Sequence, residues 1–308
     1  MRRILLRIAY DGTDYVGWQK QDNGTAVEEV LNNALGELTG EDIAVIGASR
    51  TDSGVHAMDN VAVFDTGSRI PADKFCLALN RYLPNDIVIQ SSCEVEPDFH
   101  PRYRECRKTY EYSVYNAIVP NPLMNRYTYF VHHFLDIDAM NRAAGYLTGE
   151  HDFASFCSAG AQVKTTVREI FSIECIRYPV NEEQAVYAQC DIKRNVVMRA
   201  DKEQVVDARA DKDQVVDAQA DKERIAGGTA QRSFDACKIV IRITGSGFLY
   251  NMVRIIAGTL IQIGQGMYPP DKMKDIIEAC DRTQAGPTAP PQGLTLKRIL
   301  YSGQEDNP

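Results

Sequence analysis

A polar loop close to the start of the chain holds residue types that could do chemistry. Residues 47–57 read GASRTDSGVHA and lie between two apolar segments. Arg50 and Asp52 stand two positions apart in this loop, so a guanidinium and a carboxylate could reach into one cleft. That pair suits acid–base or nucleophilic chemistry. Arg and Asp in loops are usually solvated or turn-forming, and this alternative stays open.

A second group of candidate residues is basic and lies further along the chain. Residues 100–110 read HPRYRECRKTY, with one Glu and four basic side chains: Arg102, Arg104, Arg107 and Lys108. The N-terminal segment adds three arginines: Arg2, Arg3 and Arg7. Tyrosines are interleaved with the basic residues, a pattern that fits contacts with nucleic-acid phosphates. A solvated charged face is the other interpretation.

Composition limits the classes of protein to consider. The chain has 308 residues, with 34 Lys and Arg against 42 Asp and Glu, a formal charge of -8. Its 44% hydrophobic and 25% charged residues exclude a disordered, collagen-like or membrane-dominated chain. The acidic balance argues against holding nucleic acid by net charge alone. It is compatible with a local basic groove.

Cysteine and histidine usage predicts a cytoplasmic protein without a metal site. The eight cysteines are scattered singly and only five histidines occur, so no cluster suits zinc. Scattered cysteines are typical of a reducing cytosol. The N-terminal apolar stretch is too short for a signal peptide, and no run approaches the roughly 20 apolar residues that span a bilayer. His56 shows no evident carboxylate partner, so we assign it, like Trp18, a structural role.

The elements that position the polar loop follow from hydrophobic periodicity. Strands are expected at 3–10, 43–46, 61–64 and 87–90, and helices at 27–38 and 71–82. Thr25 and Glu28 have the spacing of a capping box at the start of the first helix. This order is not a clean parallel alternation. It predicts an α+β fold with an antiparallel sheet and helices gathered on one face.

The second half of the chain repeats the same element types. Strands are expected at 110–115, 169–178 and 238–244, and helices at 138–147, 247–263 and 270–280. We therefore predict two α/β lobes, 1–105 with the polar loop and 106–302, followed by a tail at 303–308. Arg254 lies in the apolar helix at 247–263, whose other residues leave little polar surface, so it requires a partner.

An insertion is expected at about 181–235 within the second lobe. Three similar units that begin ADKEQ, ADKDQ and ADKER recur every ten residues, and the segment holds twelve acidic and nine basic residues. Ten is not a whole number of helical turns but suits alternating strands, which favours a hairpin-like or flexible protrusion. We interpret it as a solvated insertion, with a docking arm as the alternative.

Several blocks in order resemble the tRNA pseudouridine synthase A family, and they cover the chain from about residue 3 to 301. They are YDGTDYVGWQKQ at 10–21, RTDSGVH at 50–56, KTYEY at 108–112, GEHDFASF at 149–156, TTVR at 165–168, GFLYNMVR at 247–254 and GL at 293–294. Ser49 stands where the family usually has Gly, and Ser53 where it usually has Ala. The insertion is longer than is typical of the family.

The resemblance implies a fold and an activity. The fold would be two ferredoxin-like or RRM-like lobes that form a largely antiparallel sheet flanked by helices. The activity would be isomerisation of uridine to pseudouridine at positions 38 to 40 of the tRNA anticodon stem-loop, with neither a metal nor an organic cofactor. The family is homodimeric, with a tRNA groove formed across both subunits, so a homodimer is expected here.

The resemblance also assigns roles to residues. Asp52 would be the nucleophile, at ribose C1′ or at uracil C6, and both routes stay open. Tyr110 would line the uracil pocket with its hydroxyl near C5, although strand tyrosines are commonly just half-buried. Arg254 would pair with Asp52 and keep it ionised. Arg50 would help to flip the nucleotide, or form a loop salt bridge. The basic cluster and Leu294 would contact the substrate.

Two other functions remain as alternatives. The first is a non-catalytic tRNA-binding protein or chaperone on the same scaffold, which would have no need of Asp52, Tyr110 and Arg254 together. The second is a hydrolase such as a nucleosidase, which would need a second carboxylate to activate water. Asp59 is the nearest candidate in the sequence, and it would give free uracil as the product.

Overall fold

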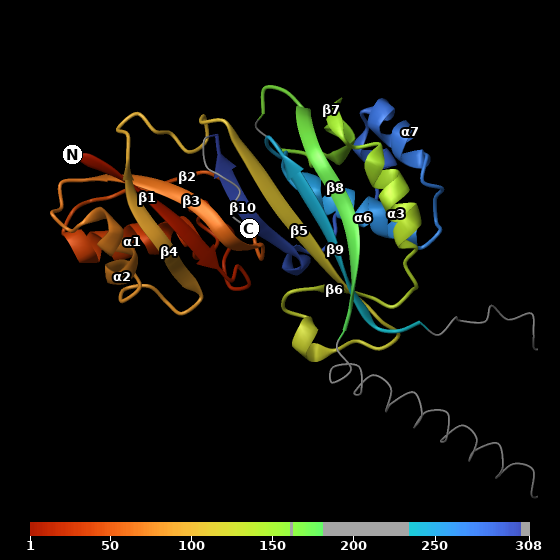
Figure 1. Ribbon diagram of the computed structural model, residues 1–308, viewed down its shortest axis with the longest axis horizontal. Coiled ribbons are helices and arrows are strands. Elements are labelled where there is room, and N and C mark those ends of the chain that lie inside the picture. Colours follow the sequence, from red (N-terminus) through yellow and green to blue (C-terminus); the bar gives the residue numbers. More distant parts are fainter. Residues whose placement is uncertain (161–162, 181–233, 303–308) are drawn as a thin grey trace, which may run out of the picture.

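A single ten-stranded sheet runs through the protein in a computed structural model that describes residues 1–160, 163–180 and 234–302 (Figure 1). The strand order is β4-β1-β3-β10-β5-β9-β8-β7, with β2 paired to β3 and β6 to β5. Only the β10–β3 and β5–β6 pairs are parallel. The prediction of a mixed α and β fold with a largely antiparallel sheet flanked by helices is confirmed. The division into two lobes at residue 105 stays a prediction.

The first half of the chain supplies four strands and two helices. These are β1 (Arg2–Tyr10), α1 (Val27–Thr39), β2 (Ile46–Gly47), β3 (His56–Thr66), α2 (Phe75–Leu79) and β4 (Ile87–Val95). β1 lies between β3 and β4, antiparallel to both. The buried residues of α1 recur at helical spacing and join the hydrophobic core: Val27, Leu31, Ala34 and Leu35.

Three local predictions in this half are wrong. The capping box does not form, because Ala26 is the N-cap and the Glu28 carboxylate accepts from the Lys20 amide instead. The strand expected at 43–46 is limited to Ile46–Gly47, since the Val45 amide donates to the Asn32 side chain. The helix expected at 71–82 is a 3-10 turn followed by the short α2, after which the Asn80 side chain bonds the backbone of Ile89.

Among the residues that the structure describes, the second half supplies the other six strands and three helices. These are β5 (Cys106–Asn116), β6 (Tyr129–Val131), α3 (Ile137–Gly145), β7 (Gly149–Asp152), β8 (Val167–Pro179), β9 (Cys237–Gly245), α6 (Met252–Gly264), α7 (Lys272–Ala279) and β10 (Leu294–Tyr301). Sequence analysis did not predict β6, β7 or β10. Residues 181–233 connect β8 to β9, so the predictions for the insertion lie outside the described residues.

The last strand, β10, joins strands from the two halves of the chain. It pairs in parallel with the start of β3, where Leu296 lies opposite Ala57. On its other side it is antiparallel to β5, where Leu296 lies opposite Tyr110. β3 begins at His56, where the polar loop ends. β10 therefore sets the spacing between the end of that loop and the tyrosine strand (Figure 1).

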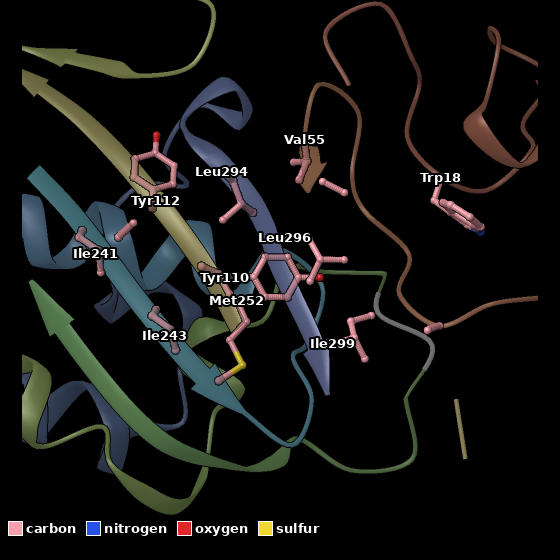
Figure 2. Close-up of a cluster of buried hydrophobic side chains, with 14 of the residues drawn as sticks. Trp18, Val55, Tyr110, Tyr112, Ile241, Ile243, Met252, Leu294, Leu296 and Ile299 are labelled. Atoms are coloured by element: carbon pink, nitrogen blue, oxygen red, sulfur yellow. The ribbon is translucent and has the colours of Figure 1, made fainter. Parts of the chain in front are cut away.

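The core beside β10 is built by alternation along neighbouring strands. Tyr110 and Tyr112 of β5 lie opposite Ile243 and Ile241 of β9, and all four side chains are buried. Met252, the first residue of α6, packs into the same cluster (Figure 2). Because successive strand residues point to opposite faces, this alternation gives one apolar face for the helices to cover. No helix in the described part of the chain is long and apolar enough to cross a membrane.

Truncation of the central β10 side chain tests this arrangement. Leu296 is fully buried, so Leu296→Ala is expected to lower the free energy of unfolding by about 2–5 kcal/mol through lost burial and a cavity. Urea denaturation measures the change. The neighbouring Lys297, whose side chain is 41% exposed, provides the control, and Lys297→Ala should cost less than about 1 kcal/mol. Equal effects of the two substitutions would contradict the central place of β10.

Candidate active site

The polar loop at 47–56 docks on the segment that follows β1. Asp52 forms an isolated β-bridge with Gly17, and the Trp18 amide donates to the Thr51 carbonyl over 3.0 Å. Gly17 has a φ of +113°, and a Cβ there would lie 2.6 Å from the Thr51 oxygen. Only glycine allows this close approach. The tight contact fixes the backbone on which Asp52 stands.

Two basic side chains hold the start of the same loop. Nε of Arg102 donates to the Gly47 carbonyl over 2.7 Å, and Nζ of Lys108 donates to the Ala48 carbonyl over 2.9 Å. Burial, with a smaller effect of the Arg102 charge, lowers the pKa of Lys108. Sequence analysis placed both residues against RNA phosphates. The structure shows that each has a donor committed to the loop backbone.

Asp52 and Arg254 come together from distant parts of the chain. Oδ2 of Asp52 lies 3.6 Å from Nη1 of Arg254, and the two side chains are 24% and 15% exposed. Arg254 stands in the first turn of α6, where Nε donates to the Ala289 carbonyl over 2.8 Å and Nη1 to Oδ1 of Asn251 over 2.7 Å. These bonds fix the plane of the guanidinium, so it presents a defined charge to the carboxylate.

Two opposing effects act on the pKa of the Asp52 carboxylate. Burial raises its pKa above the ordinary 3.8, and the nearby positive charge of Arg254 opposes this rise. An ionised carboxylate with little hydration and one cationic partner can attack an electrophilic carbon and later leave again.

Tyr110 contacts both the polar loop and the segment that precedes α6. Its side chain is 6% exposed, and its hydroxyl lies 2.8 Å from Oγ of Ser49. The ring meets the edge of Phe248, with centroids 5.2 Å apart. Burial raises the pKa of Tyr110 to about 12, the Ser49 hydrogen bond opposes the rise, and the Asp52 charge adds to it. Tyr110 therefore keeps its proton at neutral pH.

Ser49 is a site residue that sequence reasoning missed. Its hydroxyl bonds Tyr110 and its carbonyl accepts from the buried Asn60 side chain over 3.1 Å. The available signal was its departure from the usual glycine of the resembling family, which gives this chain a hydroxyl at that point. Ser49 thus links the loop of Asp52 to the tyrosine strand.

The helix expected to begin at residue 247 begins at Met252, and this difference shapes the site. Asn251 has a φ of 60°, a left-handed conformation that ends the preceding turn before α6 starts. The extra loop lets Phe248 reach Tyr110 while Arg254 stays within the first helical turn. Hydrophobicity alone does not distinguish such an apolar loop from an apolar helix.

The other predicted site residues differ in exposure. Arg50, Arg104 and Arg107 are exposed. The Arg107 guanidinium lies 5.0 Å from the centre of the Phe171 ring. Leu294 is 5% exposed and lies opposite Tyr112 at the start of β10, so it packs in the core that supports the site (Figure 2).

His56 lies beside a carboxylate, and its Nδ1 accepts a hydrogen bond from the Gly12 amide over 3.1 Å. Its Nδ1 lies 3.1 Å from Oδ1 of Asp11, which is also bonded by Arg126 and Tyr127. Burial alone would raise the pKa of Asp11, but the hydrogen bonds from Thr13 and Tyr127 lower it to about 2. Sequence analysis did not foresee this neighbour of His56, because Asp11 lies 45 positions earlier in the chain. The described residues include no group of three or more His, Cys, Asp or Glu that could hold a metal ion.

The raised pKa of Asp52 predicts a change in stability with pH. The folded state binds the Asp52 proton more tightly than the unfolded state, so ionisation costs stability above the folded pKa. Asp52→Asn is neutral at every pH and should raise the Tm at pH 7, while Arg254 keeps its bonds to Asn251 and Ala289. The gain should vanish as the pH falls below 3.8, because Asp52 is then neutral in both states.

Calorimetry across this pH range measures the difference, with Asp22→Asn at an exposed loop position as the control. A Tm gain for Asp52→Asn that persisted unchanged at low pH would contradict an origin in the buried charge.

The chain is similar to known proteins along almost its whole length. A family model described as tRNA pseudouridine synthase matches residues 7–104 and 143–302. The tRNA pseudouridine synthase A of Acetivibrio thermocellus is 41% identical over 301 residues, 98% of this chain and 100% of that protein. The proteins of the same name from Ruminiclostridium cellulolyticum and Caldicellulosiruptor bescii are 42% and 40% identical over the same shares. The chain therefore belongs to the tRNA pseudouridine synthase family.

Proposed function

We propose that this protein converts uridine to pseudouridine in tRNA, with Asp52 as the nucleophile and positions 38 to 40 of the anticodon stem-loop as its targets. The observation that carries this proposal is the Asp52–Arg254 pair, 3.6 Å apart beside the buried hydroxyl of Tyr110. The names of the relatives state that those proteins act on tRNA and make pseudouridine. Their similarity to this chain extends over almost its whole length.

The reaction is an isomerisation that needs no oxidant or reductant. The Asp52 carboxylate attacks either ribose C1′, which expels the uracil, or C6 of the uracil ring. In both routes the N1–C1′ bond breaks, the ring turns, and a C5–C1′ bond forms. The C5 proton leaves and N1 gains a proton, so the product has the same atoms as the substrate.

Three features of this chain's own residues contribute to the reaction. Arg254 stabilises the ionised form of Asp52 before attack and again when the carboxylate leaves. Tyr110 offers a flat buried ring under the uracil and a hydroxyl on the side of Ser49. The side chains of Asp52 and Arg254 are both largely buried, which limits their hydration and strengthens the interaction between their charges.

The target uridine must leave its helical stack before it can turn. Flipping costs a few kcal/mol, and the exposed Arg50 stands in the same loop as Asp52, where a guanidinium can fill the gap. Arg104 and Arg107 are exposed and suit phosphate contacts. We further propose a cytoplasmic homodimer with the groove formed across both copies, as the family resemblance implies.

The hydrolase alternative requires a second carboxylate, and its candidate, Asp59, is engaged in an ion pair. Oδ2 of Asp59 lies 2.5 Å from Nη1 of Arg7 on the neighbouring strand β1. A carboxylate oxygen engaged by a guanidinium at that distance is not available to orient and activate a water molecule. No observation in the described residues favours this alternative or a non-catalytic role.

Removal of the proposed nucleophile is the direct test. Asp52→Ala should abolish pseudouridine formation in a tRNA transcript while tRNA binding changes little, because the phosphate contacts remain. Pseudouridine is measured by tritium release from 5-³H-uridine, and binding by filter retention. Ser53→Ala, which restores the usual family residue, is the control and should stay active. A normal rate for Asp52→Ala would refute the assignment, and free uracil from the wild type would favour a hydrolase.

The target position is tested separately by mapping pseudouridine in tRNA from cells that lack the protein. Loss confined to positions 38 to 40 is expected. Unchanged anticodon stem-loops would refute that part of the proposal and leave the chemistry of Asp52 untouched.

Lys108 is expected to act on the loop backbone and not on the RNA. Lys108→Met removes the bond to the Ala48 carbonyl and should lower kcat about ten- to a hundred-fold through misplacement of Asp52, with tRNA Kd almost unchanged. The exposed Arg104→Met should show the reverse pattern, a weaker Kd with the same kcat. A weaker Kd with normal kcat for Lys108→Met would return Lys108 to the RNA-binding surface.

A further inference from the structure

The loop between β4 and β5 presents an aromatic ring to solvent. Tyr103 is 85% exposed, although a tyrosine usually buries much of its apolar ring. His100 covers one face, with ring centroids 4.2 Å apart and planes at 26°, a stacked arrangement. The exposed fraction shows that the remainder of the Tyr103 ring is open. An aromatic surface backed by a second ring has no evident role in packing.

This loop is held in place, so the Tyr103 ring is presented in a defined position. The amides of Tyr103 and Arg104 both donate to the His100 carbonyl over 3.1 Å. The Tyr301 hydroxyl donates to the Pro101 carbonyl over 2.9 Å. A ring on a fixed loop loses little conformational entropy when a ligand stacks on it.

The surroundings of Tyr103 carry positive charge and adjoin the proposed active site. Arg102 and Arg104 flank it in the sequence and both are exposed. Arg102 bonds the Gly47 carbonyl, three residues before Arg50. Burial and the Arg50 charge lower the pKa of Arg102, and the Glu28 charge opposes this change.

We propose that Tyr103, backed by His100, is a stacking platform for an unpaired nucleobase of the bound RNA. The flat open ring would take the base, and the exposed guanidinium of Arg104 would take a neighbouring phosphate. This proposal rests on the proposed function, since it supplies a further contact for the same substrate. A second copy of this chain is the rival occupant, and it would not require the surrounding positive charge.

The test uses the full-length protein and an anticodon stem-loop RNA. Tyr103→Ala should raise Kd and KM about five-fold or more with kcat unchanged, because base–aromatic stacking contributes to binding and not to chemistry. Tyr103→Phe should restore the wild-type values, since the ring and not the hydroxyl stacks. The matched control is Tyr82→Ala, because Tyr82 is a 46% exposed tyrosine after α2.

Salt dependence separates stacking from charge. Tyr103→Ala should leave the slope of log K against log salt unchanged, because no cation is lost. Arg104→Ala should reduce that slope by about one, the value of a single phosphate contact. The two variants therefore distinguish the ring from its charged neighbours.

Three results would overturn the proposal. They are an unchanged Kd for Tyr103→Ala, a fall in its kcat alone, and a change of oligomeric state in analytical ultracentrifugation, which would assign the ring to a second copy. Failure of the proposed function is distinguishable, because the wild type would then form no pseudouridine in the same assay while its Kd for RNA is still measured.

Discussion

The ion pair between Asp52 and Arg254 is the interaction around which the other contacts are arranged. A carboxylate taken from water loses hydration, and Arg254 restores part of that stabilisation from 3.6 Å away. The pair also connects the loop before β3 to the first turn of α6. Each partner needs its own support, which Gly17 gives to the loop backbone and Ala289 gives to the guanidinium. The pair therefore stabilises the ionised carboxylate and also connects two segments that are distant in the sequence.

The basic residues near the candidate site divide into two groups: some hold the loop backbone, and others face solvent. Arg102 and Lys108 direct donors at consecutive carbonyls of the Asp52 loop, whereas Arg50 and Arg104 face solvent. This division shows why a formal charge of -8 says little about the partner. Binding of a polyanion depends on the few cations that the surface exposes close together. The cations bonded to the loop carbonyls serve the geometry of the site.

Predictions from local pattern failed where a contact from elsewhere in the chain competed. Thr25 and Glu28 have capping-box spacing, but the Glu28 carboxylate accepts a hydrogen bond from the Lys20 amide. An apolar helix was expected from residue 247, but Asn251 adopts a left-handed conformation and delays it. The start of α6 matters most for function, because it decides how Arg254 meets Asp52. Local rules describe what a segment can do, and the competing contacts decide which option is used.

The sequence by itself determined the fold class, most strand positions and the three central side chains of the candidate site, because periodicity and ordered motifs are local properties. Only the tertiary structure decided that β10 inserts between β3 and β5, that Ser49 bonds Tyr110 and that Asp11 lies beside His56. These contacts join residues between 45 and more than 200 positions apart. No local pattern encodes such pairings, because they arise from how the segments pack and which buried polar groups then need partners.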